Sequence, residues 1–362
     1  MRISAIFLAC AATPALAFPG MHNILAEIQA HVARDLGARS TVLSRDSGSD
    51  ADTGSDADTE EVQNIEDVPQ LAGGPIDHSR ESSYKPPGPL GSPPCSEDYL
   101  CVWYYVSRQM WGDFADASGC TELGRGAIRL GFHDAAAWDV TSPYGGADGS
   151  ILLTDEILRP VNKGLEFIAP RTREYYEKYH PYGAGMADII QLGNIVGTIA
   201  CPGGPRIRAF AGRKDDPRPA PPNKLPEPSM DAPEIIELFA RKTFSARDVV
   251  ALIGSHTSAI QRFVDPRRAG ASMDTDKSIW DTLYYRETLR GDNKTIFILH
   301  SDWSLATYPD TRRDFEEFAS PRGQVTWNPA YAQAYFRMSF LGVKNLNELR
   351  EISQVLPSRP RR

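Results

Sequence analysis

The stretch from Gly124 to Ala136 has the sequence G-R-G-A-I-R-L-G-F-H-D-A-A and is the most informative part of the chain. Arg129 and His133 stand four residues apart in it, so a helix projects both side chains from one face. A guanidinium beside an imidazole is favourable only while the imidazole stays neutral, because two positive charges repel. A neutral imidazole next to a fixed cation accepts a proton, while the cation stabilises the anion left behind. The stretch therefore predicts a helix that carries a proton-transfer pair.

Helical periodicity dominates the chain beyond this stretch. Aliphatic residues between Ile189 and Ile199 repeat at helical spacing and run into the C-P-G-G turn that begins at Cys201. Ser245 is an N-cap candidate, and the apolar positions after it lead to His256 at the end of the same helix face. Because no run of alternating strand residues appears, we expect a mainly α-helical fold with long loops and few short strands.

The acidity of the chain is concentrated near its N-terminus. The formal net charge over 362 residues is −8, but nine acidic residues between Asp46 and Asp67 have no Lys or Arg among them. Setting these nine aside leaves 39 basic against 38 acidic residues. A nearly neutral body predicts no binding to nucleic acid or to an anionic membrane. No segment reaches the roughly 18 consecutive apolar residues of a membrane span. We also expect the protein to be a monomer.

The first 94 residues are expected to precede the main domain. Residues 1–17 form a signal peptide, with a charged start, an apolar run and a small-residue cleavage site, so we expect secretion. Residues 18–43 form either a propeptide helix or a loosely attached N-terminal helix. Residues 44–94 hold a repeated G-S-D-A-D-T and a Pro- and Gly-rich linker, for which a disordered spacer is favoured over a calcium-binding repeat. The domain is then expected over 95–350, with a tail over 351–362.

Four cysteines remain after removal of the signal peptide, at 95, 101, 120 and 201. An even number in an oxidising compartment predicts two disulfides, and the residues alone leave three pairings open. Asn293 begins an N-K-T glycosylation sequon, which is usable in a secreted chain.

Four motifs, in order, resemble the plant-type haem peroxidase superfamily. Its secreted fungal class, which includes lignin, manganese and versatile peroxidases, is the most similar. The motifs are R-L-G-F-H-D at 129–134, G-G-A-D-G-S at 145–150, C-P-G-G-P at 201–205 with A-G-R at 211–213, and L-I-G-S-H-T at 252–257. The resemblance runs from about Cys95 to Glu348. It implies a two-domain helical fold with haem b between the domains and an enzyme that reduces hydrogen peroxide.

The resemblance assigns the distal side of such a site to the first motif. His133 would be the base that moves a proton between the oxygens of the peroxide, and Arg129 would stabilise the developing charge. Asn162, with Glu156 behind it, would fix the tautomer of His133. Phe132 would pack on the distal side of the haem.

The proximal side is assigned to the last motif. His256 would ligate the haem iron, and Asp302 would accept a hydrogen bond from its other ring nitrogen. Arg262 would contact a haem propionate, although a surface Arg is an equal interpretation. The same resemblance pairs Cys120 with Cys201, which leaves Cys95 with Cys101.

Two calcium sites are implied, one beside each histidine. The first would use Asp134, Gly146, Asp148 and Ser150. The second would use Thr257, Asp274, Asp276, Ile279 and Asp281. Ordinary Asp/Gly turns are the alternative interpretation, and Asp276 stands where the relatives usually have Thr.

Departures from the family pattern bear on the electron donor. Manganese oxidation needs three carboxylates, but only Glu122 fits, since Gly126 and Arg262 occupy the other positions. The surface relay Trp of lignin and versatile peroxidases is replaced by Ala251, and Met273 stands where an aromatic residue usually flanks the proximal pocket.

Short loops before Gly146 and Asp302 lead to the hypothesis of an open haem edge that serves small phenolic donors directly. An alternative relay at Trp138 or Trp280 is the second possibility for electron transfer. A catalytically weak haem- and calcium-binding protein is the main alternative function, but it has no need of the complete catalytic set. A hydrolase built on Ser255 lacks the strand–turn–helix context of its motif.

Overall fold

The computed structural model of the protein describes residues 74–79, 82–291 and 293–360. The described residues belong to one compact unit, Gly73–Arg362. The expected signal peptide, the 18–43 segment and the acidic repeat lie outside the described residues.

Helices form nearly all the regular structure, as the sequence predicts. The α-helices are α2 (Pro93–Ser96), α3 (Tyr99–Phe114), α4 (Glu122–Ala135), α5 (Ser150–Leu153), α6 (Ala169–Tyr179), α7 (Met186–Ala200), α8 (Ala232–Ala240), α9 (Ala246–Ile253), α10 (Leu283–Arg290), α11 (His300–Thr307), α12 (Pro309–Ala319) and α13 (Gly323–Met338). The named strands are two-residue antiparallel pairs, β1 (Ala115–Asp116) with β2 (Gly119–Cys120) and β3 (Phe210–Ala211) with β4 (Arg350–Glu351).

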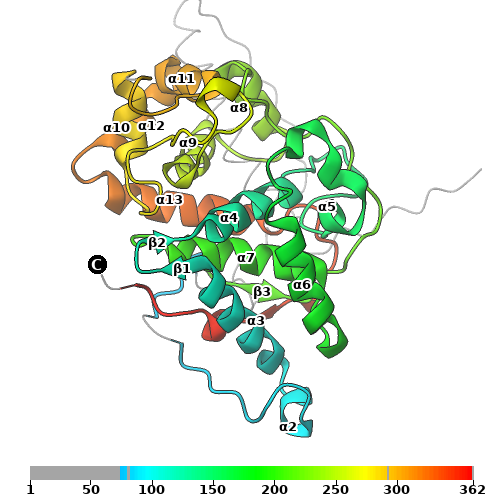
Figure 1. The fold of residues 1–362 in the computed structure, drawn as a ribbon. Helices are drawn as coiled ribbons and strands as arrows, with labels where there is room; N and C mark the ends of the chain where they lie inside the picture. The colour runs from blue at the N-terminus through cyan, green and yellow to red at the C-terminus, as the bar shows by residue number, and fades with distance from the viewer. Residues whose placement is uncertain (1–73, 80–81, 292, 361–362) are drawn as a thin grey trace, which may run out of the picture. The chain divides into compact units, whose positions relative to one another are not determined.

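The helices form two groups, which Figure 1 shows as a teal and green set and a yellow and orange set. The first contains α3, α4, α6 and α7, and the second contains α8 to α12. Helix α13 contacts both groups. Tyr335 donates to Oε1 of Gln191 in α7 at 2.8 Å, and Nε1 of Trp327 donates to the carbonyl of Ala251 in α9 at 2.9 Å. The expected mainly α-helical fold is confirmed.

Helix α4, which carries the 124–136 stretch, is fixed by its close packing on α7. Thr121 caps its N-terminus by accepting from the amide of Gly124. A Cβ at Gly131 would lie 2.6 Å from Cβ of Asn194, and one at Gly197 would lie 2.5 Å from the carbonyl oxygen of Gly124. The glycines therefore let the two backbones approach closely. Every residue of α7 is buried.

Helix α9 begins as predicted but ends earlier. Ser245 and Asp248 form a reciprocal capping box at its start. The α-helix stops at Ile253, so the prediction that His256 lies on it is wrong, and His256 sits in a 3-10 turn, Gly254–Ser258. Side chains from α10 and α13 crowd this point, since a Cβ at Gly254 would lie 2.1 Å from Oη of Tyr285. The close contact leaves room only for glycine where the chain changes direction.

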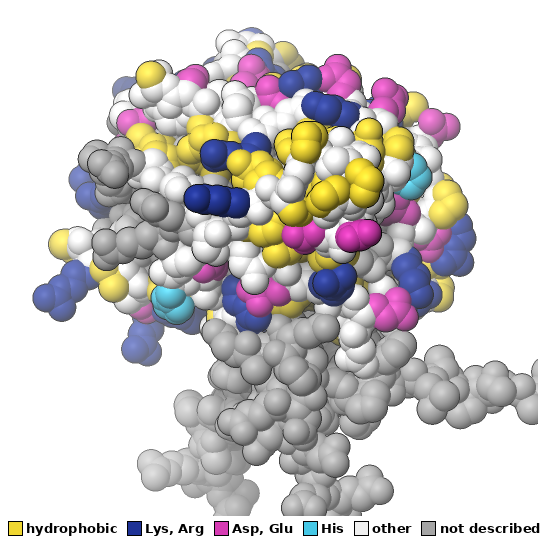
Figure 2. Space-filling model, turned by 90° about the horizontal axis from the view of Figure 1, so that it is seen from below, with side chains coloured by type: hydrophobic (Ala, Val, Ile, Leu, Met, Phe, Trp, Pro, Cys, Tyr) yellow, Lys and Arg dark blue, Asp and Glu magenta, His cyan; other side chains and the backbone are white. Residues whose placement is uncertain are grey.

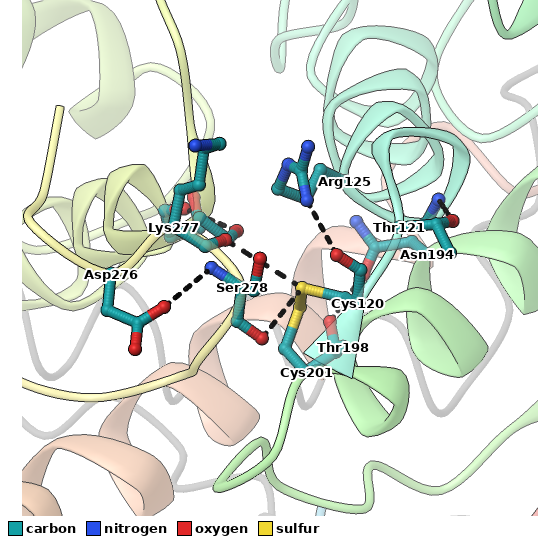
Figure 3. Close-up of a disulfide and its surroundings, with 12 residues drawn as sticks. Cys120, Thr121, Arg125, Asn194, Thr198, Cys201, Asp276, Lys277 and Ser278 are labelled. Atoms are coloured by element: carbon teal, nitrogen blue, oxygen red, sulfur yellow. Dashed lines mark hydrogen bonds between the residues drawn. A yellow bond between two sulfur atoms is a disulfide. The ribbon is translucent and has the colours of Figure 1, made fainter. Parts of the chain in front are cut away.

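The disulfide Cys120–Cys201 joins β2 to the end of α7, and Cys95–Cys101 closes a short loop at the start of α3. This is the pairing that the resemblance implies. Figure 3 shows the 276–278 loop beside the first disulfide. The amide of Cys120 donates to the carbonyl of Ser278 at 3.1 Å. This hydrogen bond thus ties the loop before α10 to β2, at the disulfide.

The folded unit extends beyond the expected 95–350 at both ends. Fully buried Arg206 pairs with Asp77 at 2.7 Å and also donates to the carbonyls of Leu356 and Pro357. Residues 74–79 are therefore part of the fold and not a free linker, and residues 351–357 are packed and not a tail.

The surface carries both signs of charge. Figure 2 shows the face seen from below in Figure 1, where basic and acidic side chains are interspersed around a band of hydrophobic ones. This face therefore presents no single-sign field of the kind that attracts a polyanion. No helix among the described residues is long and apolar enough to cross a membrane.

Candidate active site

His133 is held through one nitrogen of its ring. Its Nδ1 lies 2.8 Å from Oδ1 of Asn162, and Nδ2 of Asn162 donates to the backbone carbonyl of Glu156 at 2.8 Å. Because Oδ1 only accepts, this network places the proton of His133 on Nδ1 and leaves a lone pair on Nε2. Burial, and then the charge of Arg129, lowers the pKa of His133 well below 6.5, against the effect of the Asn162 bond. The imidazole is therefore neutral at pH 7.

Arg129 is solvent-accessible, and the open region beside its guanidinium is called the recess below. Its Nη1 donates to the carbonyl of Lys163 at 2.9 Å. The side chain is accessible to solvent, yet burial lowers the pKa of its guanidinium to about 10, with Glu166 opposing. The guanidinium is therefore open to solvent and also close to other protein atoms.

One stripe of α4 leads from this recess toward the surface. Glu122, Gly126, Arg129 and His133 follow one another at i, i+4, i+7 and i+11, so they lie on one face of the helix. A Cβ at Gly126 would lie 2.6 Å from the ring of Phe167, so this phenyl group covers the middle of the stripe. Phe167 itself is 40% exposed.

Phe263 lies beside the guanidinium of Arg129. Both approach Gly164, where an added Cβ would lie 2.7 Å from the phenyl ring and 3.1 Å from Nη1 of Arg129. Nζ of Lys163 lies 4.8 Å from the ring centroid of Phe263, which is 44% exposed. Two accessible phenyl rings thus lie beside the face of α4 that carries Arg129 and His133.

His256 is held in the same manner as His133. Its Nδ1 lies 3.1 Å from Oδ2 of Asp302, which is fully buried. The ring of Tyr284 meets the imidazole edge-on at a centroid distance of 5.9 Å. Among the described residues nothing bonds Nε2 of either histidine, so both nitrogens are free for chemistry.

Three contacts tie the surroundings of the two histidines together. The rings of Phe132 in α4 and Phe239 in α8 stack at 6.3 Å. Phe263, in the loop that follows His256, reaches Arg129 as described above. Arg262 forms an ion pair with Glu122 at the start of α4. The two imidazoles therefore belong to one region, where the two helix groups meet.

Buried carboxylates gather directly behind His133. Oδ1 of Asp134 is buried without a hydrogen-bond partner. Burial raises the pKa of Asp134 well above its ordinary value, and the charges of Asp148 and Glu156 raise it further. Burial also raises the pKa of Asp148 to about 6. Three acids that repel one another around an unpaired oxygen would be stabilised by a bound cation.

The other expected ligands of this cluster are nearby. Ser150 donates to Oε2 of Glu156 at 3.2 Å, and the carbonyl of Gly146 accepts from the amide of Asp148 at 2.8 Å. The cluster is thus connected to His133 by a short path from Ser150 through Glu156 and Asn162.

A second acidic cluster lies next to His256. Thr257 donates to Oδ2 of Asp274 at 2.7 Å, and the amide of Asp276 donates to Oδ1 at 2.7 Å. Burial raises the pKa of Asp274 to about 7, and the charge of Asp281 adds to it. The amide of Ile279 bonds the carbonyl of Asp276, which folds the loop around the cluster.

Calcium fits these clusters better than a metal that needs side-chain ligands alone. In the described part of the chain, no three His, Cys, Asp or Glu side chains form a ready group for a metal ion. Calcium also takes hydroxyl and carbonyl oxygens, which both clusters supply.

Comparison with known proteins identifies the family of the chain. The model of the peroxidase family matches residues 107–321, more than half of the chain. The chain belongs to the peroxidase family. It is a haem peroxidase, an oxidoreductase that uses hydrogen peroxide.

Several curated fungal peroxidases are similar to this one. It is 32% identical over 231 residues to a low-redox potential peroxidase of Taiwanofungus camphoratus, covering 59% of this chain and 68% of the relative. It is 28% identical over 302 residues to a peroxidase of Coprinopsis cinerea, covering 75% of this chain and 82% of the relative. It is 31% identical over 287 residues to manganese peroxidase 3 of Phlebia radiata, covering 72% of this chain and 78% of the relative.

The structure bears on two expectations about the electron donor of this peroxidase. Glu122, the one carboxylate at a manganese position, is taken by its ion pair with Arg262. Trp280 is 0% exposed and stacks on Trp327 at 4.9 Å, so its candidacy as a surface relay is wrong. Trp138 remains partly exposed.

The sequence interpretation did not anticipate Phe239, Phe263 or Tyr284 in this peroxidase site. Tyr284 lies in the run Leu283-Tyr284-Tyr285, whose composition indicates only core. Phe263 follows a loop without periodicity. Such contacts are set by tertiary packing, so no local pattern identifies them.

Proposed function

We propose that this peroxidase is secreted, acts as a monomer and oxidises small phenolic donors by one-electron steps at the recess that Arg129 lines. The observation that carries the proposal is the matched state of the two histidines. Each is bonded at Nδ1 and free at Nε2, and His133 is held neutral beside a guanidinium.

Haem b, when bound, supplies the redox centre that peroxide oxidises by two electrons and that donors reduce one electron at a time. We assign Nε2 of His256 to the iron. Asp302 accepts from Nδ1–H, which makes the imidazole a stronger ligand. Phe132 would pack on the distal side of the haem.

His133 and Arg129 perform the proton chemistry in this proposal. Nε2 of His133 takes the proton of the attacking peroxide oxygen and returns it to the leaving oxygen as water forms. Arg129 stabilises the negative charge that develops while the O–O bond breaks. Asn162 keeps the imidazole in the tautomer that can accept.

Small phenols are the donors that the recess suits. Phe167 and Phe263 offer accessible rings for stacking along the stripe of α4, and Lys163 lies over the second ring. Manganese is not favoured as donor, because Glu122 is paired with Arg262 and Gly126 brings no carboxylate. A relay through Trp138 is not needed for a donor that reaches the recess itself.

Two calcium ions would brace the two histidines. The first would bind Asp134, Asp148, Ser150 and the carbonyl of Gly146. The second would bind Thr257, Asp274, Asp276, Asp281 and the carbonyl of Ile279. The unpaired oxygen of Asp134 supports the first, and the raised pKa of Asp274 supports the second. Asn293 is exposed and available to carry a glycan.

The experiment compares donors on the haem-loaded enzyme. We expect peroxide-dependent turnover of a small phenol and little turnover of Mn²⁺. Phe263→Ala should raise KM for the phenol several-fold and leave the rate of the peroxide reaction unchanged, whereas Val325→Ala, at an exposed site on α13, should change neither. Efficient Mn²⁺ turnover, or an unchanged KM in Phe263→Ala, would contradict the donor assignment. Absence of all turnover would favour a haem-binding protein without catalysis.

A further inference from the structure

Lys163 stands at a point of the backbone that contacts both side chains of the proposed proton transfer. The residue before it, Asn162, bonds Nδ1 of His133 at 2.8 Å, and the carbonyl of Lys163 accepts from Nη1 of Arg129 at 2.9 Å. The amide of Lys163 donates to the carbonyl of Pro160 at 3.1 Å. The backbone of Lys163 is therefore fixed relative to His133 and Arg129, and its side chain starts beside the recess.

The ammonium of Lys163 lies against an aromatic ring and has no counterion. Its side chain is exposed, and Nζ lies 4.8 Å from the ring centroid of Phe263. No carboxylate in the described part of the chain forms an ion pair with it. The ring of Phe263 also approaches Gly164, beside Nη1 of Arg129. An accessible phenyl ring thus has an unpaired ammonium on it and the recess next to it.

The other cations near this ring already have partners. Arg262 is paired with Glu122 at the start of α4. Arg125 is half-buried, and its Nη1 donates to the carbonyl of Cys120 at 2.6 Å. Of the three cations, Lys163 is therefore the one whose charge is available to an external anion.

We propose that Lys163 and Phe263 select phenolic donors that carry a carboxylate, such as para-hydroxycinnamate. This inference rests on the proposed function, because it requires that phenols are oxidised at the recess. The ring of the donor stacks on Phe263, its hydroxyl faces the recess, and its carboxylate pairs with the ammonium. A Lys side chain is long and flexible, so the ammonium can move from the phenyl ring to the carboxylate while its backbone stays in place.

The carboxylate binds the donor and takes no part in the redox step. Each donor loses one electron and its hydroxyl proton and leaves as a phenoxyl radical with its carboxylate unchanged. Two donors supply the two electrons and two protons that convert one hydrogen peroxide into two waters. The step therefore needs no reagent besides peroxide and the donor.

Glu166 is the charge that opposes this selection. Its Oε2 accepts from the amide of Gly164, the residue after Lys163. Its charge also acts on Arg129, since it raises the pKa of that guanidinium against the larger effect of burial. The carboxylate of Glu166 is therefore close to the recess and repels an anionic donor. Its removal should strengthen the selection that removal of Lys163 weakens.

The test compares para-hydroxycinnamate with its methyl ester on the haem-loaded enzyme. At about pH 7 both have a neutral phenol, and they differ by one negative charge. The measured quantity is the ratio of kcat/KM for the acid to kcat/KM for the ester. We expect Lys163→Met to lower this ratio about two- to fivefold, which is the effect of one ion pair at an exposed site. Lys163→Glu should lower it further, and Lys163→Arg should preserve it.

Two other variants and salt separate this local effect from net charge. Glu166→Gln should raise the ratio. Lys85→Met removes the same charge from an exposed position before α2 and should leave the ratio at its wild-type value. A rise in ionic strength from about 0.01 M to about 0.15 M should lower the ratio in the wild type and much less in Lys163→Met, because salt screens exposed charges.

A second readout needs no turnover. Titration of the haem-loaded enzyme with each donor, without peroxide, gives a Kd from the change in Soret absorbance. Lys163→Met should raise the Kd of the acid relative to that of the ester by the same factor. The proposal is overturned if Lys163→Met keeps the wild-type ratio, including the case of equal losses on both donors, or if Lys85→Met lowers the ratio as much. A wild type that reacts with peroxide and oxidises neither donor would instead overturn the proposed function.

Discussion

Asn162 holds His133 by a 2.8 Å hydrogen bond to Nδ1, and the carbonyl of Glu156 fixes Asn162 in turn. Glu156 also accepts from Ser150 of the first acidic cluster. The orientation of the base is therefore set by a chain of polar contacts that reaches the proposed calcium site.

Asn162→Leu removes the acceptor for Nδ1–H. The peroxide reaction should slow by about 10–100-fold, as is typical when a partner that orients a functional histidine is lost. Stopped-flow mixing of the haem-loaded variant with peroxide measures this. Asn347→Leu, at an exposed position, serves as control, and equal rates for the two variants would refute the orienting role.

Removal of calcium should loosen both histidines. Without a cation, Asp134, Asp148 and Glu156 repel one another, as do Asp274 and Asp281. A chelator should lower the melting temperature, and added Ca²⁺ should restore it because binding to the folded state stabilises that state. Asp148→Asn should weaken the response, whereas exposed Asp155→Asn should not. A melting temperature that does not change when chelator is added would exclude structural calcium.

Lys242 gives the stability a distinctive pH dependence. It is 0% exposed, its Nζ donates to the carbonyl of Trp138 at 2.9 Å, and burial lowers its pKa from 10.5 to about 7. Between these values the unfolded chain binds more protons than the folded one, so this group's contribution to the free energy of unfolding rises with pH. Below pH 7 both states are protonated and the full cost of burying the charge remains.

Lys242→Met should therefore raise the free energy of unfolding above that of the wild type, and by most at low pH. The gain should shrink as pH rises, until the lost hydrogen bond, about 1 kcal/mol, makes the variant the less stable protein. Urea unfolding at about pH 6 and about pH 9 measures the difference. A difference that is the same at both values would contradict this prediction.

Arg206 should be worth more to stability than its neighbour Arg208. Fully buried, it joins Asp77 near the start of the fold to the carbonyls of Leu356 and Pro357 near its end. Arg206→Met should lower the free energy of unfolding by about 3 kcal/mol, since it strands a partly buried carboxylate and several carbonyls. Arg208→Met, which loses a more exposed partner in Glu351, should cost clearly less. Equal losses of the free energy of unfolding in the two variants would show that the first and last segments of the fold are not held through Arg206.

Local patterns predicted the elements of this site well. The capping box at Ser245 and the aliphatic run that ends at Cys201 gave α9 and α7 their expected positions. The turn that carries His256 was missed because it depends on Tyr285 and Trp327, which crowd Gly254 from distant parts of the chain.

The ends of the domain were misplaced for a related reason. Proline-rich composition indicates irregular backbone, and residues 82–92 are indeed without helices or strands. Irregular backbone is still part of a fold when a buried ion pair such as Arg206–Asp77 holds it. Composition cannot reveal that partner. The stacking residue Phe263 was missed likewise, since its place beside Arg129 follows from tertiary contacts alone.

The most direct test of the account is the rate at which the haem-loaded enzyme reacts with hydrogen peroxide when His133 is replaced. In His133→Leu the Soret band should be retained, because His256 still binds the iron. The second-order rate constant should fall by about 10²–10⁴, the usual contribution of a positioned general base. A rate constant equal to that of the wild type would contradict the assignment of His133 as the base.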